Sequence, residues 1–215
     1  MNQYIREPFN GLSHLLGALL SLLGLSAMIV KVSIKDASSL SITAIIIFGI
    51  SMILLYSSSA TYHMVIAKDS IIQFLRRLDH SMIYLLIAGT YAPFCLITLK
   101  GTIGYLLFTV ISIIAICGVL FKMIWFKCPR WISTALYIGM GWIIVFLAVP
   151  LTEKIGTQGI FYLVLGGVLY TIGGIIYGLK PKIAFISKLG FHEIFHIFIL
   201  LGTLCHFICV FLFVI

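Results

Sequence analysis

Three histidines and one aspartate of this chain belong to the residue types that bind metal ions, although they lie far apart in the sequence. They are His63, Asp79, His192 and His196. Because His192 and His196 are four residues apart, a helix would place both imidazoles on one face, about 6 Å apart along its axis. Imidazole suits zinc, and a catalytic zinc ion typically takes three protein ligands and a water molecule. These residues predict a zinc site in which His63 supplies the third imidazole.

Asp79 has three candidate roles at such a site, because it can bind the ion directly, hold the zinc-bound water, or orient a histidine. Ser59 precedes His63 by four residues and so lies one helical turn away on the same face. Its hydroxyl can donate to a metal-bound water or to a substrate carbonyl, or it can bond only the carbonyl four residues earlier in its helix. Asp79 and Ser59 are the candidate catalytic residues. The alternative for the whole set is a group of interfacial polar side chains solvated by water and lipid headgroups.

Residues 192–196 also read H-E-I-F-H, which matches the H-E-x-x-H pattern of zinc metalloproteases. In that pattern Glu193 would act as the general base. Adjacent residues on a helix are rotated by about 100°, however, so Glu193 points away from the face that carries His192. A five-residue pattern with free positions is weak evidence by itself, and protease chemistry is the less favoured alternative.

The composition places the chain in a membrane. Hydrophobic residues make up 62% of its 215 positions and charged residues only 9%, which is more apolar surface than a soluble domain of this size can bury. A membrane-spanning helix needs about 20 apolar residues. By this rule we expect one all-α membrane domain, 1–215, built as a bundle of seven transmembrane helices at about 11–30, 40–63, 79–99, 103–121, 131–151, 159–179 and 190–215.

The distribution of positive charge predicts the orientation of these helices. Ten of the 14 Lys and Arg residues fall in joints on one side, and four (Lys31, Lys35, Lys100 and Lys154) fall on the other. The ten are Arg6, Lys68, Arg76, Arg77, Lys122, Lys127, Arg130, Lys180, Lys182 and Lys188. Since cytoplasmic joints are enriched in Lys and Arg, we expect a cytoplasmic N-terminus and an external C-terminus. This topology accounts for the net charge of +8 without nucleic acid, and it puts all four candidate metal ligands on the cytoplasmic side.

Two glycines of the sixth expected span, Gly174 and Gly178, have the small-xxx-small spacing that lets helices approach closely. The spacing indicates packing within the chain or, less favoured, a dimer face. A homo-oligomer is therefore a candidate assembly.

Three motifs in the chain resemble those of the haemolysin III family, the bacterial branch of the progestin and adipoQ receptors. The first precedes and enters the first span, the second joins the second and third spans, and the third leads into the last span. In order along the chain, they consist of Glu7, Asn10 and His14; residues 59–63 (S-A-T-Y-H) and 77–80 (R-L-D-H); and Ser187, His192, His196 and His206.

The resemblance implies a multi-pass protein of the bacterial plasma membrane, with seven helices and a zinc ion near the cytoplasmic face. In the family the ion is held by the histidines that match His63, His192 and His196, and the aspartate that matches Asp79 contacts it through water. Relatives are grouped with alkaline ceramidases and suspected of zinc-dependent amide hydrolysis on lipids. The bacterial branch takes its name from haemolytic activity.

These observations leave three functions open. The favoured group is a membrane protein that acts on or senses membrane lipids through its zinc site, either as a hydrolase of lipid amide bonds or as a regulator in which zinc is structural. The alternative is a pore-forming cytolysin. A pore would need a continuous polar stripe along the spans, and the sequence has none.

Overall fold

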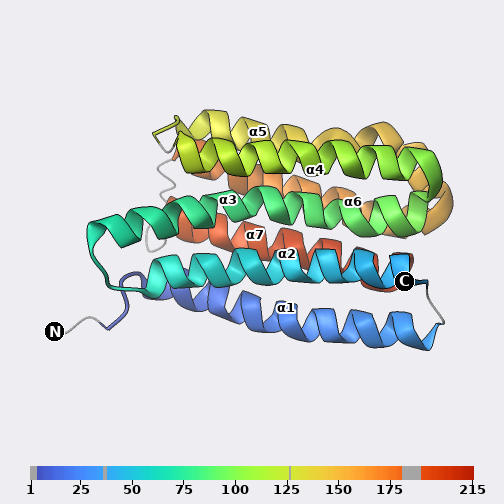
Figure 1. The fold of residues 1–215 in the computed structure, drawn as a ribbon, viewed down its shortest axis with the longest axis horizontal. Helices are drawn as coiled ribbons and strands as arrows, with labels where there is room; N and C mark the ends of the chain where they lie inside the picture. The colour runs from blue at the N-terminus through green and yellow to red at the C-terminus, as the bar shows by residue number, and fades with distance from the viewer. Residues whose placement is uncertain (1–3, 36–37, 126, 181–189) are drawn as a thin grey trace.

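The computed structural model describes residues 4–35, 38–125, 127–180 and 190–215, and throughout these ranges its regular elements are helices (Figure 1). They are α1 (Pro8–Ile34), α2 (Ser39–Met64), α3 (Asp69–Pro93), η1 (Phe94–Leu99), α4 (Gly101–Ile124), α5 (Arg130–Trp142), η2 (Ile143–Leu147), α6 (Ala148–Leu179), α7 (Phe191–Cys209) and η4 (Val210–Val214). Ser187, Lys182 and Lys188, named above, lie outside the described residues. The expected all-α architecture is confirmed.

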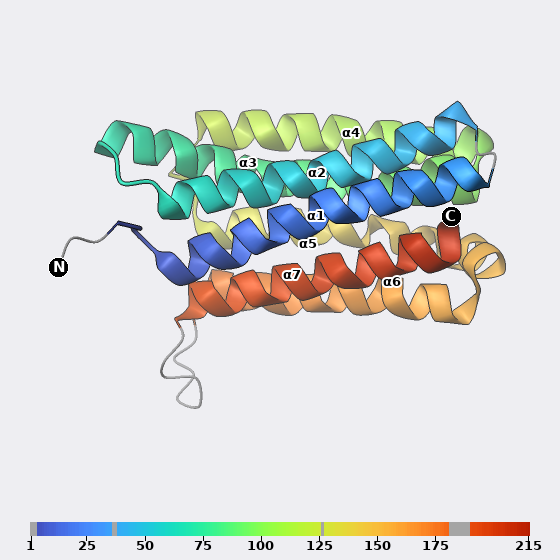
Figure 2. The same ribbon diagram turned by 90° about the horizontal axis from the view of Figure 1, so that it is seen from below.

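Six helical segments within the described residues are long and apolar enough to cross a membrane. The fifth and sixth expected spans fall within one of them, the 50-residue segment Arg130–Leu179. This segment contains a backbone break, because Gly156 has φ 69° and ψ 175°, a conformation that glycine adopts far more easily than other residues. Gly156 lies within α6, and α6 packs against α5 (Figure 2).

Helix α3 begins ten residues before the expected start of the third span, at Asp69 rather than at residue 79. Hydropathy predicts only the part of a helix that lies in the hydrocarbon. The hydrogen-bonded helix itself extends beyond that part into the polar residues before it. Asp69 in the first turn also favours a helix start, because a negative charge stabilises the amino end of a helix.

The regular α-helical part of α3 ends at Pro93, but the helical path of the chain continues beyond it. Proline cannot donate a backbone hydrogen bond, and the chain continues as the π-helical turn η1 through Leu99. The three serines at 57–59 likewise leave α2 unbroken. Ser58 donates to the carbonyl of Leu55 at 2.9 Å, so its hydroxyl is satisfied inside its own helix.

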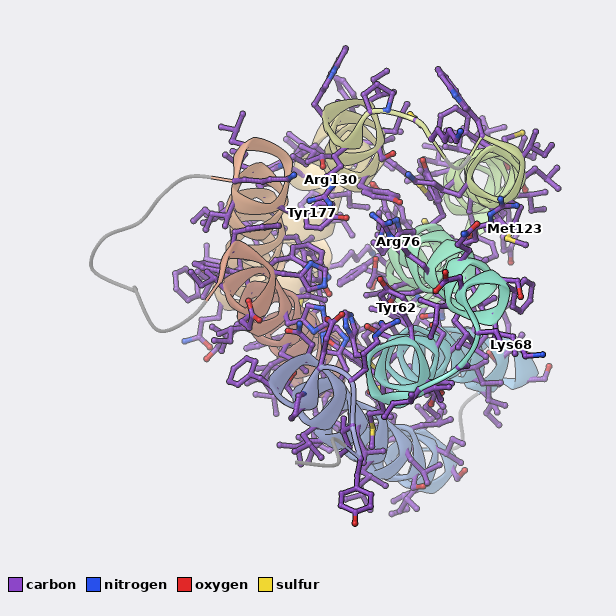
Figure 3. All side chains as sticks on the ribbon, turned by 90° about the vertical axis from the view of Figure 1, so that its left-hand side faces the viewer. Tyr62, Lys68, Arg76, Met123, Arg130 and Tyr177 are labelled. Carbon is purple, nitrogen blue, oxygen red and sulfur yellow. The ribbon has the colours of Figure 1, made fainter. Side chains whose placement is uncertain are left out.

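The helices form a closed ring. Helix α1 packs against α2 and α7, α2 against α3, α3 against α5, and α5 against α6, which packs against α7; α4 packs against α3. Figure 3 looks along the bundle from the end at which α1 begins, and Figure 1 marks the two termini at opposite ends.

Large apolar side chains cover the outside of the ring as well as the inside. Leu23 and Phe146 are 66% and 87% exposed, while Phe48 and Tyr56 inside the bundle are at most 1% exposed. The buried set also contains polar side chains, among them His14, Ser59, His63, Asp79 and His196. An apolar exterior around a partly polar interior is the arrangement expected when lipid is the solvent.

One close helix contact tests this packing. A Cβ atom on Gly104 of α4 would lie 2.1 Å from the backbone carbonyl oxygen of Cys95 in η1. A Cβ atom on Gly139 of α5 would meet nothing within 4 Å. We expect Gly104→Ala to destabilise the protein by about 1–3 kcal/mol through overpacking, and Gly139→Ala to leave the stability equal or higher.

Thermal unfolding of the two purified variants in the same detergent measures this difference. Both changes add one methyl group to a helical glycine, so helix propensity cancels in the comparison. A Gly104→Ala protein that melts at or above the Gly139→Ala temperature would contradict the packing described here.

Candidate metal centre

The three histidines expected to bind a metal lie together inside the bundle. His63 is in the last turn of α2, and His192 and His196 are in the first two turns of α7. Nε2 of His192 lies 3.3 Å from Nε2 of His63 and 3.1 Å from Nε2 of His196. The candidate ligand atoms of the three residues all lie within 4.8 Å of one another. This arrangement could hold a metal ion.

The spacing of these nitrogens suits a tetrahedral ion. Two nitrogens bound to one such ion at about 2.0–2.1 Å lie roughly 3.3–3.4 Å apart, which is close to the observed separations. His63 and His196 are each 1% exposed, so both side chains are shielded from bulk solvent. Three converging imidazoles, two of them buried and that of His192 half-buried, fit a divalent cation as their common partner.

Glu7 sets the tautomer of His63. Its Oε2 lies 2.6 Å from Nδ1 of His63. A carboxylate only accepts hydrogen bonds, so Nδ1 carries the proton and Nε2 keeps its lone pair, directed at the other two imidazoles. A hydrogen bond from the second ring nitrogen to a carboxylate is typical of metal-bound histidine.

The segment before α1 is attached to the end of α2 by the backbone as well. The amide of Glu7 donates to the carbonyl of His63 at 2.9 Å, and the Arg6 guanidinium donates to the carbonyl of Tyr62 at 2.5 Å. Asn10 donates from Nδ2 to Oε2 of Glu7 at 3.2 Å. Partial burial opposes ionisation of Glu7, but His63, Asn10 and Arg6 together hold the pKa of this carboxyl below its ordinary value.

Sequence reasoning placed Glu7 in a motif and on the expected side of the membrane but assigned it no role. The signal available was chemical, because a buried metal-bound histidine needs an acceptor for its second N–H. Glu7 lies just before the first span. The end of the second span is on the same side of the membrane, so His63 lies near it. Its pairing with His63 is a long-range contact that periodicity does not report.

His14 of α1 supports His196 from the other side. The two rings stack with centroids 3.7 Å apart and an angle of 18° between their planes. Tyr56 contacts the edge of His14 with a centroid distance of 5.1 Å. These contacts fix the plane of His196, so His14 is a positioning residue; the sequence placed it in a motif but gave it no role.

Asp79 and Ser59 are not members of the group of converging ligand atoms. Both are buried, and their side chains are neighbours. Within the described part of the chain, the Ser59 hydroxyl has no partner of ordinary hydrogen-bond geometry. Ser59 and Asp79 line the same cavity as His192 and His196. The direct ligand role of Asp79 stays a prediction, and this placement is also compatible with contact through water.

The remaining titratable residues named from the sequence have other surroundings. Glu193 is absent from the converging group, and its carboxylate lies over Gly190 at the start of its own helix. His80 faces the Tyr177 hydroxyl, with 3.3 Å between Nε2 and the oxygen. His206 bonds another helix, because its Nε2 lies 3.2 Å from the carbonyl of Leu163 in α6.

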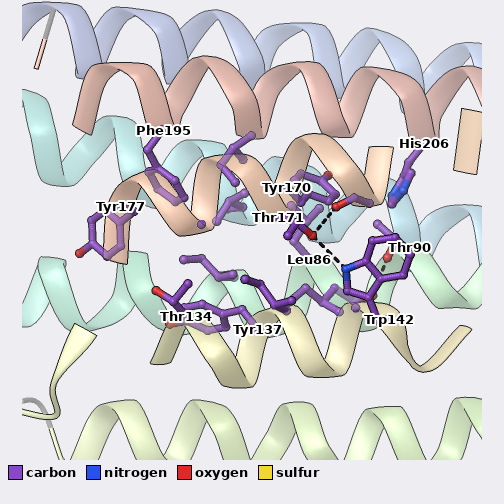
Figure 4. Close-up of a pocket in the computed structure, with 18 of the residues that line it drawn as sticks. Leu86, Thr90, Thr134, Tyr137, Trp142, Tyr170, Thr171, Tyr177, Phe195 and His206 are labelled. Carbon is purple, nitrogen blue, oxygen red and sulfur yellow. Dashed lines mark hydrogen bonds between the residues drawn. The ribbon is translucent and has the colours of Figure 1, made fainter. Parts of the chain in front are cut away.

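A cavity of about 170 Å³ extends from the histidines along the bundle interior. Figure 4 shows Tyr177 and Phe195 toward one end of the cavity and Thr90, Trp142 and His206 at the other. Its walls are mostly apolar side chains, and Trp142 donates from Nε1 to the Thr171 hydroxyl at 2.9 Å near the far end. The shape and lining suit a long apolar group whose polar end faces the histidines.

Metal analysis tests the centre directly. We expect purified wild-type protein to carry about one divalent ion per chain, and the His192→Ala/His196→Ala double variant to carry almost none, because one imidazole cannot retain the ion. Elemental analysis of well-folded preparations measures both. Equal metal content in the two proteins would contradict the site.

Replacing Glu7 tests the role of its carboxylate. We expect Glu7→Gln to weaken metal binding by about 10–100-fold, since the amide no longer fixes the proton on Nδ1 of His63. Competition with a chelator of known affinity measures the change, and Glu153→Gln, at an exposed position, is the matched control. The prediction is wrong if both variants bind the metal as the wild type does.

Comparisons with known proteins agree with the motifs. The family model described as "Haemolysin-III related" matches residues 2–207. "Hemolysin-3" of Bacillus cereus is 39% identical over 215 residues, which is 100% of this chain and 94% of that protein. "Hemolysin-3 homolog" of Bacillus subtilis (strain 168) is 39% identical over 204 residues, covering 95% of this chain and 92% of its own length. The chain is a multi-pass membrane protein that belongs to the haemolysin III family.

Proposed function

We propose that this protein is a zinc-dependent hydrolase that cleaves an amide or ester bond of a membrane lipid. The observation that carries the proposal is the opening of a buried three-histidine centre onto a long, mostly apolar cavity. A lipid tail fits such a cavity, and its carbonyl group would then lie beside the histidines. The apolar walls would not contribute to the binding of a polar, soluble substrate.

In this proposal each side chain of the site has a separate role. His63, His192 and His196 hold the ion, Glu7 fixes the tautomer of His63, and His14 fixes the plane of His196. When bound there, zinc would lower the pKa of a water molecule toward ~7 and polarise the scissile carbonyl. Asp79 would accept the proton of the attacking water and Ser59 would donate to the carbonyl oxygen, and both residues line the cavity.

The proposed topology has seven spans, with the segment Arg130–Leu179 crossing twice and turning at Gly156. The N-terminus and the metal centre would face the cytoplasm. Support comes from the ten Lys and Arg residues assigned to that side and from the packing of α5 against α6.

Pore formation is the alternative raised by the names of the two relatives. The mostly apolar lining of the cavity does not favour a water-filled path. Dye release from liposomes that contain the purified protein separates the two functions, because a hydrolase in the membrane leaves them sealed.

Hydrolysis of a fluorescent ceramide, with a matched phospholipid ester as a second substrate, tests the proposal. We expect Asp79→Asn to lower turnover by about 10²–10⁴-fold, since the proton acceptor is lost. Asp69→Asn, an exposed change on the same helix, is the control and should leave turnover unchanged.

The metal-ligand variant His196→Ala completes the experiment. Equal turnover in wild type, Asp79→Asn and His196→Ala would contradict the hydrolase. If His196→Ala instead lowers the unfolding temperature and wild type hydrolyses neither substrate, zinc has a structural role and the protein is a lipid sensor or regulator.

A further inference from the structure

Three cationic side chains line the cavity at the end that holds the metal centre. They are Arg76 of α3, Lys122 near the end of α4 and Arg130 at the start of α5. Figure 3 looks onto this end and shows Arg76, Arg130 and Tyr177 inside the ring of helices. Lys68, by contrast, lies on the outside of the same end.

Lys122 is the unusual member of the set because it is only 4% exposed. Lysine is almost never fully buried unless it is paired, since removing an ammonium group from water is costly. Among the described residues, no carboxylate lies within salt-bridge distance of Lys122. Its position calls for an anion that the chain itself does not supply.

Arg130 is held in place by aromatic rings. Its guanidinium carbon lies 5.2 Å from the centre of the Tyr177 ring and 5.7 Å from that of Phe191. Within the described residues, its buried Nη1 has no hydrogen-bond partner. Stacking fixes the plane of the guanidinium and leaves N–H groups at its edge to donate, which is the geometry that binds phosphate in a bidentate way.

The balance of charge along the cavity favours an anion. Asp79 is the one acidic residue among its described lining residues, against the three cations named above. These charges act in a low-dielectric environment, where an unbalanced excess attracts an anion more strongly than it would in water.

Tyr177 connects this cationic group to the metal centre. One contact of its ring is with the Arg130 guanidinium, and another is with His192, at a centroid distance of 5.6 Å. An anion held by the cations would therefore lie near His192, at the end of the cavity that holds the histidines.

We propose that Arg76, Lys122 and Arg130 bind the headgroup phosphate of an anionic phospholipid whose tail enters the cavity. The apolar walls favour a lipid over free phosphate as the source of the anion. The inference deepens the proposed function by naming the substrate class, and it rests on that function only for the position of the bond to be cleaved.

Lipid binding is measured without turnover. Short-chain phosphatidylglycerol, or short-chain phosphatidylcholine, is titrated into the detergent-solubilised full chain, and its dissociation constant is taken from the rise in unfolding temperature. We expect wild type to prefer phosphatidylglycerol. Lys122→Met and Arg130→Gln should each weaken phosphatidylglycerol binding by about tenfold, since a hydrogen bond to a charged group is lost.

Lys68→Met is the matched control, because it removes an exposed positive charge from the same end of the bundle. It should bind phosphatidylglycerol as the wild type does. Equal affinity for the two lipids in wild type, or an equal loss in Lys68→Met, would overturn the proposal. Arg130→Gln keeps the test decisive if Lys122→Met does not fold.

Inorganic phosphate distinguishes the two sources of the anion. If phosphate alone stabilises wild type and abolishes its preference for phosphatidylglycerol, the site takes a soluble anion and the lipid proposal is wrong. A protein that hydrolyses nothing would still show the lipid preference, and a hydrolase without this site would not. Failure of the two proposals can therefore be told apart.

Discussion

Water is missing from the hydrocarbon interior of a membrane, so each polar side chain buried in this bundle needs a partner from the bundle itself or from a ligand bound inside it. The histidines satisfy this condition by converging on one point, where a cation would pair with all three at once. The hydrogen bond from His63 to Glu7 then directs one lone pair toward that point. Without it, the ring could present an N–H group to the ion, and the centre would lose a ligand.

Helix packing and site chemistry depend on the same contacts. His14 stacks on His196 because α1 lies beside α7, and Glu7 reaches His63 because α1 lies beside α2. The candidate metal centre therefore lies where the first, second and last helices meet. Its candidate ligands belong to α2 and α7, and the side chains that position them belong to α1 and the residues before it.

Much of the arrangement could be predicted from residue types and spacing. Long apolar runs indicated the helices, and His192 and His196 had to share a face because they are four residues apart. His63 could be assigned to the same layer because hydropathy placed it at a helix end. The contribution of Glu7, the stacking of His14 and the early start of α3 depend on which helices are neighbours, and periodicity along the chain contains no such information.

Helix α3 and η1 form a single wall of the cavity, from Arg76 and Asp79 at one end to Phe94 at the other. The π-helical turn after Pro93 keeps this wall continuous where a proline would otherwise bend it. Any sliding of the helix along its axis would displace both ends together. On the two proposals above, one continuous helix would contact both the headgroup and the tail of the lipid, so selection for a longer or shorter lipid would also move Asp79.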